Sequence, residues 1–447
     1  MMQPLPATRR DWDARVRTGD AGHLLARDDN AFFRQSGSTP CLNAIAKAEG
    51  IWLEDVDGRR IMDFHGNSVH HIGYGHPRLK AALKAQIDEL PFTPRRYTSE
   101  PAVELAERLL ARSPHGDNGK VLFATGGSDA IEIALKLARV RTGRYKTLGF
   151  FDSYHGHGFG AVSAGGSGTD RSHRIGPLIP GGLLVPPFRC GACPYGFSRR
   201  QDGEAPIETC GMMCARMLRH ALECEGDIAA VIAEPIRSTP YVPPPGFWPA
   251  VRQACDAFGV LLIFDEIPTG LGKTGRLFTS EHQGVRPDIT VLGKALGGGM
   301  LPLAAVIADR DFDVAPELSL GHYTHEKNPL TTRAGLTTLQ IIEDEGLVER
   351  SRDLGAQTLE RLAEMAATVP TIGRAEGAGL LIGVEILDRG GCPSQPLAER
   401  AMWRAMALGL SLKASAGRLV LSPPLTITDA EMHLALDIVE RAVGNET

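Results

Sequence analysis

The sequence lacks a long apolar run, a block of like charge and a secretory pattern at its N-terminus. No apolar run approaches the roughly 18–20 residues that a membrane-spanning helix needs. The 447 residues carry a net charge of −5 without a cluster of one sign, which argues against nucleic acid and anionic membranes as partners. The first 20 residues contain no apolar segment of the kind found in signal peptides. These absences predict a soluble, cytoplasmic protein with no nucleic-acid or membrane partner.

Cysteine is not abundant, at eight residues in the whole chain, and reduced thiols are the default expectation for a long chain without a signal peptide. Four of the cysteines form two close pairs within an insertion at about residues 186–215: Cys190, Cys193, Cys210 and Cys214. Their spacing resembles that of zinc ligands. Two interpretations stay open, a structural zinc site and four thiols in a surface insertion, and neither implies a catalytic role.

The order of apolar segments indicates an α/β architecture. At this length the chain needs more than one small core. From about residue 100 to 310, short apolar runs alternate with amphipathic helical patterns, which predicts a mostly parallel sheet flanked by helices. From about residue 330 onward the pattern is rich in helix and predicts a smaller C-terminal domain. Ligands of such sheets bind at the carboxyl ends of the strands.

Two glycine-rich segments supply candidate binding residues at such strand ends. "TGGSDA" places Gly127 and Ser128 at the start of a helix, where exposed N–H groups and the helix dipole favour a phosphate. "DSYHGHG" places Tyr154 and His155 in a loop, where an aromatic ring can stack on a flat ligand. Many helix starts of this kind bind nothing, and a loop tyrosine is commonly structural, so neither segment is specific alone.

Two charged residues also stand at strand ends. "VLLIFDE" ends an apolar run in Asp265, and a buried carboxylate is costly unless a cation meets it. "VLGKALGGG" places Lys294 between an apolar strand and a glycine loop, where a lysine either extends to solvent or is reactive. Taken together, the two segments and the two charges describe one ligand with a phosphate, a flat ring, a ring cation and an aldehyde. Pyridoxal 5'-phosphate has these four features.

The ordered motifs resemble those of the class III (ω-amino acid) aminotransferases, which are fold type I pyridoxal phosphate enzymes. The resemblance covers nearly the whole chain and includes "GIWLEDVDGRRIMDFHGNSVHHIGYGHP", "TGGSDAIEIALKLAR", "FDEIPTGLGKTG", "PDITVLGKALGGGMLP", "THEKNP" and "LSPPLTIT". It implies a large cofactor-binding domain over residues 76–325. It also implies a smaller α+β domain, in which an N-terminal segment (1–75) joins residues 326–447.

The resemblance further implies roles for single residues. Lys294 would carry the cofactor as a Schiff base, and Asp265 would face its pyridine nitrogen. Tyr154 would stack on the ring and take part in catalysis. Thr324 would reach the phosphate of the neighbouring subunit, which implies a homodimer with shared active sites. The other residues expected to contact the cofactor are Gly127, Ser128, His155, Glu234 and Ile267.

The sequence departs from the family pattern at two positions that bear on the reaction. Pro268 stands where the family usually has a glutamine that touches the cofactor's phenolic oxygen. Val420 stands where family members that use 2-oxoglutarate or glutamate usually have an arginine that clamps the α-carboxylate. Arg418 lies two residues earlier and could substitute only if the register shifted by two. The sequence therefore lacks the arginine that would bind the α-carboxylate of the usual keto-acid acceptor.

A family enzyme without an acceptor site can eliminate ammonia instead of transferring the amine. "FHGNSVHHIGYGHP" with "PRRYTSEPAVELAERL" is similar to the branch of ammonia-lyases that act on (R)-1-hydroxy-2-aminoethylphosphonate. That similarity implies a small phosphonate-bearing amine as substrate, with phosphonoacetaldehyde and ammonia as products. The residues expected to bind the phosphonate are His65, Asn67, His70, Arg95 and Arg96.

Two alternatives remain at this point. One is a class III ω-aminotransferase that passes the amine to pyruvate or another keto acid. The other is a non-catalytic relative, against which the retention of both Lys294 and Asp265 speaks.

Overall fold

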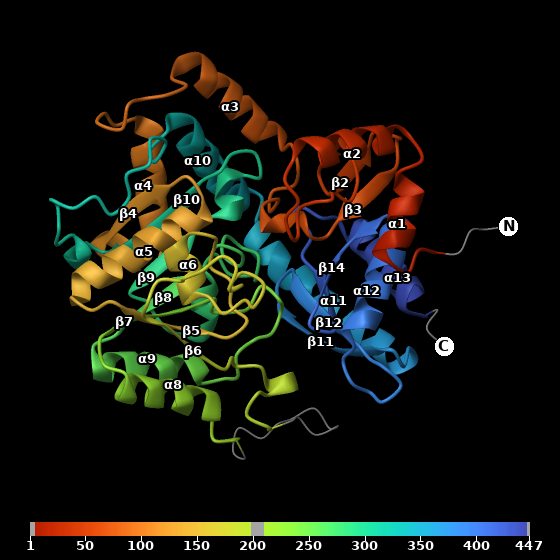
Figure 1. The fold of residues 1–447 in the computed structure, drawn as a ribbon. Helices are drawn as coiled ribbons and strands as arrows, with labels where there is room; N and C mark the ends of the chain where they lie inside the picture. The colour runs from red at the N-terminus through yellow and green to blue at the C-terminus, as the bar shows by residue number, and fades with distance from the viewer. Residues whose placement is uncertain (1–4, 198–209, 445–447) are drawn as a thin grey trace. The chain divides into compact units, whose positions relative to one another are not determined.

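The computed structural model describes residues 5–197 and 210–444, which form two compact units (Figure 1). The units comprise, first, Arg78–Gly272 and Arg276–Glu345, and second, Met1–Pro77, Lys273–Gly275 and Gly346–Thr447. Residues 326–345, which we expected in the C-terminal domain, belong to the larger unit. The reason is that helix α10 (Pro329–Asp344) packs on helix α4 (Glu100–Arg112) of that unit.

A seven-stranded sheet forms the centre of the larger unit, in the order β4-β10-β9-β8-β7-β5-β6. Strand β10 runs antiparallel to both of its neighbours, and the other neighbouring pairs are parallel. The mostly parallel sheet predicted from the sequence is therefore confirmed. The strands are β4 (Gly119–Ala124), β5 (Lys146–Phe150), β6 (Gly182–Val185), β7 (Ile228–Ala233), β8 (Leu261–Asp265), β9 (Ile289–Leu292) and β10 (Ala304–Asp309).

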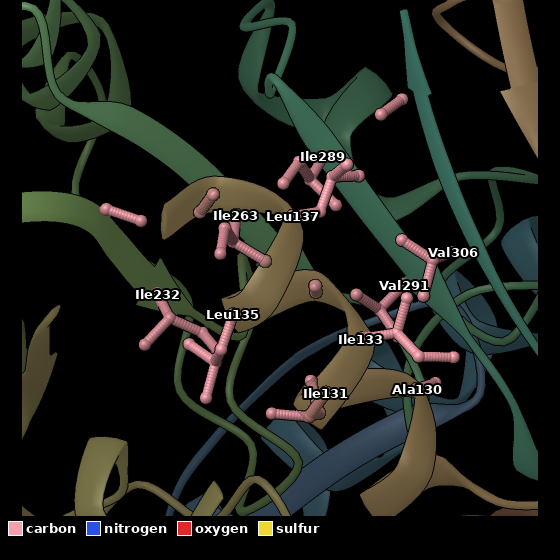
Figure 2. Close-up of a cluster of buried hydrophobic side chains, with 14 of the residues drawn as sticks. Ala130, Ile131, Ile133, Leu135, Leu137, Ile232, Ile263, Ile289, Val291 and Val306 are labelled. Atoms are coloured by element: carbon pink, nitrogen blue, oxygen red, sulfur yellow. The ribbon is translucent and has the colours of Figure 1, made fainter. Parts of the chain in front are cut away.

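Helices cover both faces of this sheet because its central strands are apolar on both sides. Ile232, Ile263 and Val291 pack against the apolar side of α5, as Figure 2 shows. Val231 and Phe264, each adjacent in sequence to one of these residues, belong to a second cluster with α8 and α9. Besides α4 and α10, the helices of this region are α3 (Pro77–Glu89), α5 (Gly127–Thr142), α6 (Phe159–Ala164), α8 (Met213–Cys224) and α9 (Phe247–Phe258).

The smaller unit contains two four-stranded sheets, ordered β1-β2-β3-β13 and β11-β12-β15-β14. Strand β13, from the C-terminal part of the chain, pairs in parallel with β3 from the N-terminal part. The strands are β1 (Ile45–Glu49), β2 (Trp52–Asp55), β3 (Arg60–Asp63), β11 (Ile372–Ala378), β12 (Leu381–Ile386), β13 (Leu410–Ser411), β14 (Lys413–Ser415) and β15 (Arg418–Leu421). The helices are α1 (Arg9–Val16), α2 (Asp20–Ala31), α11 (Leu347–Thr368), α12 (Gln395–Ala407) and α13 (Asp429–Val443). Across residues 5–197 and 210–444, no helix combines the length and the apolarity that crossing a membrane requires.

A lysine is enclosed within the smaller unit. Lys273 is fully buried, and its Nζ donates a hydrogen bond of 2.6 Å to the carbonyl oxygen of Pro423. Burial lowers the pKa of the Lys273 ammonium from 10.5 to about 7, because the interior disfavours the charged form. The unfolded chain therefore holds this proton more tightly than the folded protein does.

Because of Lys273, we expect the free energy of unfolding to increase as the pH rises from about 7 to about 10.5. In that window the unfolded chain keeps the proton and the folded protein does not, so each pH unit adds about 1.4 kcal/mol to the free energy of unfolding. Below this window both states are protonated and the contribution is constant. Thermal denaturation of the wild type and of Lys273→Met, at neutral and at alkaline pH, measures the effect. The wild type should gain more from the pH increase, and equal gains would contradict the prediction.

Candidate active site

A cavity of about 180 Å³ lies at the carboxyl ends of the central strands of the larger unit. Glu234 follows β7 directly, Asp265 ends β8, and Lys294 stands two residues after β9. Parallel neighbouring strands end at the same edge of a sheet, which brings these residues together although they are far apart in sequence. The predicted residues that line the cavity are Gly127, Ser128, Tyr154, His155, Glu234, Asp265, Ile267 and Lys294.

Three further lining residues complete the wall. Pro268 contributes a side chain without a hydrogen-bond donor, in the position where the family usually has glutamine. Gly156 and Ser238 also line the cavity, and sequence reasoning missed both. Both could have been found from their neighbours in the sequence. Gly156 directly follows Tyr154 and His155, and Ser238 stands four residues after Glu234.

Asp265 is a buried carboxylate held from two sides. Its Oδ2 lies 2.7 Å from Nδ1 of His155, and its Oδ1 accepts a hydrogen bond of 3.1 Å from the backbone N–H of Ile267. Asp265 is 2% exposed and His155 is 3% exposed. The contact assigns the proton of His155 to Nδ1, because a carboxylate accepts and does not donate. The result is an oriented negative charge that can face a cation in the cavity.

Lys294 begins a short 3-10 helix (Lys294–Gly297) with a backbone φ of 46°. This left-handed conformation is unfavourable for a residue with a side chain. Gly298 and Gly299 follow with φ of 67° and 72°, which glycine adopts without strain. Backbone strain of this kind persists where the surrounding structure imposes it, and it clusters at functional sites.

The start of α5 forms a cradle suited to an anion. Gly126 caps the helix without a side-chain hydrogen bond to its first N–H groups, and the first two residues of the helix, Gly127 and Ser128, line the cavity. A Cβ atom at Gly156 would lie 2.6 Å from Oγ of Ser128, so only glycine fits there. Oγ of Ser128 accepts a hydrogen bond of 3.1 Å from the N–H of His157, which ties the two glycine-rich segments together.

Two side chains offer apolar surface to a flat ligand. Tyr154 lines the cavity while 43% of its surface stays exposed, and burial of the remainder raises the pKa of its phenol. Ile267 is nearly buried and lies against Gly127, where an added Cβ would be 3.1 Å from its Cδ1. A carboxylate, an amine, an anion cradle and two apolar walls thus meet in one cavity.

Comparison with known proteins identifies the family. The profile described as aminotransferase class-III matches residues 33–443 of this chain. The chain belongs to the class-III aminotransferase family.

The similar proteins include a lyase, a racemase and a transaminase. The (R)-1-hydroxy-2-aminoethylphosphonate ammonia-lyase of Vibrio splendidus is 40% identical over 447 aligned residues, covering 98% of this chain and 93% of that protein. The alanine/serine racemase of Pyrococcus horikoshii is 34% identical, covering 88% and 84%. Among solved structures, an amine transaminase from an uncultivated Pseudomonas species in its PLP-bound form is 31% identical with a TM-score of 0.83, covering 92% and 98%. This chain is accordingly a pyridoxal-phosphate-dependent enzyme of the ammonia-lyase or aminotransferase type.

The residues of the cavity fit pyridoxal 5'-phosphate. The cradle at the start of α5 has backbone donors for a phosphate. Asp265 supplies an oriented buried charge for a ring cation, and Lys294 supplies an amine for an aldehyde. Glycine at position 156, where a Cβ would collide with Ser128, keeps the cradle open.

Other predicted residues lie outside this cavity. Thr324 is exposed in the segment before α10. Arg95 lies 3.5 Å from a carboxylate oxygen of Glu326, and Arg96 is exposed. Neither arginine lines the cavity beside Lys294, and Arg95 instead lines a second cavity of the larger unit.

The three predicted residues of the "FHGNSVHH" segment differ in exposure. His65 is partly exposed, and its Nδ1 accepts a hydrogen bond of 3.3 Å from the N–H of Asn67, which is exposed. His70 is fully buried, and its Nε2 lies 2.9 Å from the carbonyl oxygen of Asp63. This contact ties His70 to its own loop, and its role in binding the phosphonate stays a prediction.

The four clustered cysteines all lie in the described part of the chain. Burial raises the pKa of the Cys214 thiol to about 12, and the neighbouring Cys190 and Cys210 add to that increase. Within the described residues, no group of three or more histidine, cysteine, aspartate or glutamate side chains is arranged to hold a metal ion. The zinc interpretation of Cys190, Cys193, Cys210 and Cys214 and the alternative of four thiols in an insertion both stay open.

Arg418 forms ion pairs with two glutamates of its own sheet. It lies on β15, is 2% exposed, and its two terminal nitrogens each lie 2.6 Å from a carboxylate, one of Glu376 and one of Glu385. Val420 is buried on the same strand, paired with Gly383 of β12. A guanidinium that already pairs with two carboxylates has little affinity left for a third. Arg418 therefore does not replace the arginine that is missing at position 420.

Proposed function

We propose that this enzyme is an ammonia-lyase that converts 1-hydroxy-2-aminoethylphosphonate into phosphonoacetaldehyde and ammonia. The observation that carries the proposal is the pairing of Arg418 with Glu376 and Glu385. Together with valine at position 420, it leaves a keto-acid acceptor without the bidentate clamp that its α-carboxylate needs. The similarity to the Vibrio splendidus lyase over 98% of this chain gives independent support.

Pyridoxal 5'-phosphate, when bound, activates the C–H bond next to the amine by accepting carbanion charge into its ring. Asp265, oriented by His155 and by the N–H of Ile267, would keep the ring nitrogen protonated. The first turn of α5 would hold the phosphate, and Tyr154 and Ile267 would contact the ring.

Lys294 would move the proton at the reacting carbon. Its amine would take the proton from the carbon that bears nitrogen, and hydroxide would leave from the neighbouring carbon that bears phosphorus. Hydrolysis of the released enamine then gives the aldehyde and ammonia. Water is lost in one step and regained in the next, so the reaction needs no second substrate.

The phosphonate would be held by polar groups of the "FHGNSVHH" segment and of the arginine pair. His65, Asn67, Arg95 and Arg96 stay candidates, and Arg96 is the more available arginine because Arg95 faces Glu326. Three successive residues, Gly66–Ser68, have positive φ values of 44°, 47° and 59°. A strained turn of this kind supports a functional role for the segment.

We also propose a homodimer in which each subunit completes the site of its neighbour. The exposed Thr324 is the residue expected to reach the phosphate bound by the other subunit.

Incubation of the enzyme and cofactor with the amine alone tests the reaction type. We expect many turnovers of ammonia without any keto acid, since elimination consumes only the amine. 1-Hydroxy-2-aminoethylphosphonate should be the best substrate in a panel that includes 2-aminoethylphosphonate, which lacks the leaving hydroxyl. Strict dependence of turnover on pyruvate or another keto acid would show an aminotransferase instead.

A further inference from the structure

A buried arginine pairs with one of the carboxylates that line the cavity. Arg237 follows β7, is 5% exposed, and forms an ion pair with Glu234, which lines the cavity and is 1% exposed. Its Nη2 donates a hydrogen bond of 2.5 Å to the carbonyl oxygen of Asp152, and its Nε lies 3.4 Å from Oη of Tyr241. One guanidinium thus joins the end of β7 to the loop that follows β5.

That loop carries cofactor-contacting residues in a strained conformation. Asp152 has a φ of 71°, in the left-handed region, and stands two residues before Tyr154 and three before His155. Tyr241 donates its hydroxyl hydrogen to the Asp152 carboxylate. Aspartate tolerates this backbone region better than most residues but does not prefer it, and the bonds from Arg237 and Tyr241 help to hold Asp152 there.

We propose that Arg237 is a positioning residue, which keeps Glu234 ionised at the cavity wall and fixes the loop that presents Tyr154 and His155. This inference rests on the proposed role of the cavity as the cofactor site, and it is independent of whether the enzyme eliminates or transfers the amine.

The charges around Glu234 support the first part of the proposal. Burial by itself would raise the pKa of this carboxyl, but Arg237, and to a smaller extent His155 and the N–H of Ser238, bring it below its ordinary value. The N–H of Ser238 donates to Glu234 at 2.7 Å. Among the described residues, other charged or titratable groups near this cluster include Tyr154, Asp265 and Lys294 in the cavity wall, and Asp152, Tyr241 and Arg189.

The bonding pattern supports the second part. A guanidinium has donors in a fixed fork, so it can hold Glu234 and the Asp152 carbonyl at once. A lysine ammonium would preserve the charge without that fork. Arg237→Lys and Arg237→Gln therefore separate the effect of charge from the effect of geometry.

The test measures binding of pyridoxal 5'-phosphate to the apoprotein as a function of pH. Arg237→Gln should weaken binding by roughly 10- to 100-fold, by analogy with the loss seen when the partner that orients a metal-binding side chain is removed. It should also move the acidic limb of the pH profile upward, because Glu234 without its guanidinium partner takes up a proton at a higher pH. Arg237→Lys should restore the pH profile while leaving binding weaker than in the wild type.

Arg252→Gln is the matched control. Arg252 is a largely buried arginine of α9 that pairs with Asp288 at 2.6 Å and does not line the cavity. Its loss should lower the thermal stability of the apoprotein and leave the pH profile of cofactor binding unchanged. If Arg237→Gln behaves in the same way, Arg237 is merely structural and the proposal fails.

A double variant keeps the test decisive if Arg237→Gln does not fold. Glu234→Gln with Arg237→Gln leaves no unpaired buried charge at these positions. If Arg237 also fixes the loop before Tyr154, the double variant binds the cofactor more weakly than Glu234→Gln alone, while its acidic limb is that of Glu234→Gln. An affinity equal to that of Glu234→Gln would contradict the role of Arg237 in fixing the loop. Because these readouts do not involve ammonia, failure of the lyase assignment would leave them intact.

Discussion

Replacement of Lys294 by alanine is expected to reduce turnover by at least roughly 10²–10⁴-fold, the share that positioned proton transfer alone contributes in enzymes. The expected loss is larger if the same amine also links the cofactor, as the family resemblance implies. Lys294 follows β9 in a strained backbone conformation and lines the cavity beside Asp265. The visible absorption of the lysine-linked cofactor should disappear with the side chain.

Steady-state ammonia release and the absorption spectrum measure the two effects. Lys136→Ala is the control, because Lys136 is an exposed lysine on α5, away from the cavity. Partial rescue of Lys294→Ala by a small added amine would show that the missing amine, not misfolding, causes the loss. Normal turnover and a normal spectrum in Lys294→Ala would overturn the assignment of this cavity as the active site.

Replacement of Asp265 by asparagine is expected to lower kcat by roughly 10²–10³-fold, the range found when one preorganised electrostatic contact is removed. Asparagine has nearly the same shape and can still accept from His155, but it is neutral. A ring cation in the cavity would then lose its counter-charge and hold its proton less tightly. The folded structure should tolerate the change, because it removes a buried charge instead of adding one.

The pH dependence of kcat and the affinity for the cofactor, measured separately, distinguish this effect from a general loss of structure. Asp256→Asn serves as the control, since Asp256 is 65% exposed on α9 and pairs with Arg252. Unchanged kcat in Asp265→Asn would separate this carboxylate from the chemistry.

Sequence reasoning located the fold and most of the cavity wall because both depend on local patterns. Apolar runs that alternate with amphipathic segments specify strands and helices, and parallel strands gather their carboxyl ends at one edge. Glu234, Asp265 and Lys294 each follow an apolar strand, and the structure brings them into one cavity. Their glycine-rich neighbours carried a similarly local signal.

The adjacent acids Asp265 and Glu266 mark the limit of that reasoning. Both are buried, but the carboxylate of Glu266 accepts hydrogen bonds from the N–H groups of Thr279 and Ser280, at 2.5 and 2.9 Å, and orders the loop after β8. Burial raises the pKa of Glu266 to about 7, against the effect of those two donors. Successive side chains in extended backbone point in opposite directions, so these two neighbouring acids have different surroundings.

The sequence by itself determined the family, the architecture and the residues gathered at the strand ends, because these follow from periodicity and from the order of motifs. Tertiary structure decided which charges are available. Arg418 pairs with Glu376 and Glu385, which are 42 and 33 residues away in the sequence. Arg237 bonds the backbone of Asp152, which is 85 residues away. Lys273 is buried and donates to the carbonyl oxygen of Pro423, 150 positions along the chain. A buried charge takes whichever partner the packed chain brings within reach, and the local sequence does not specify that partner.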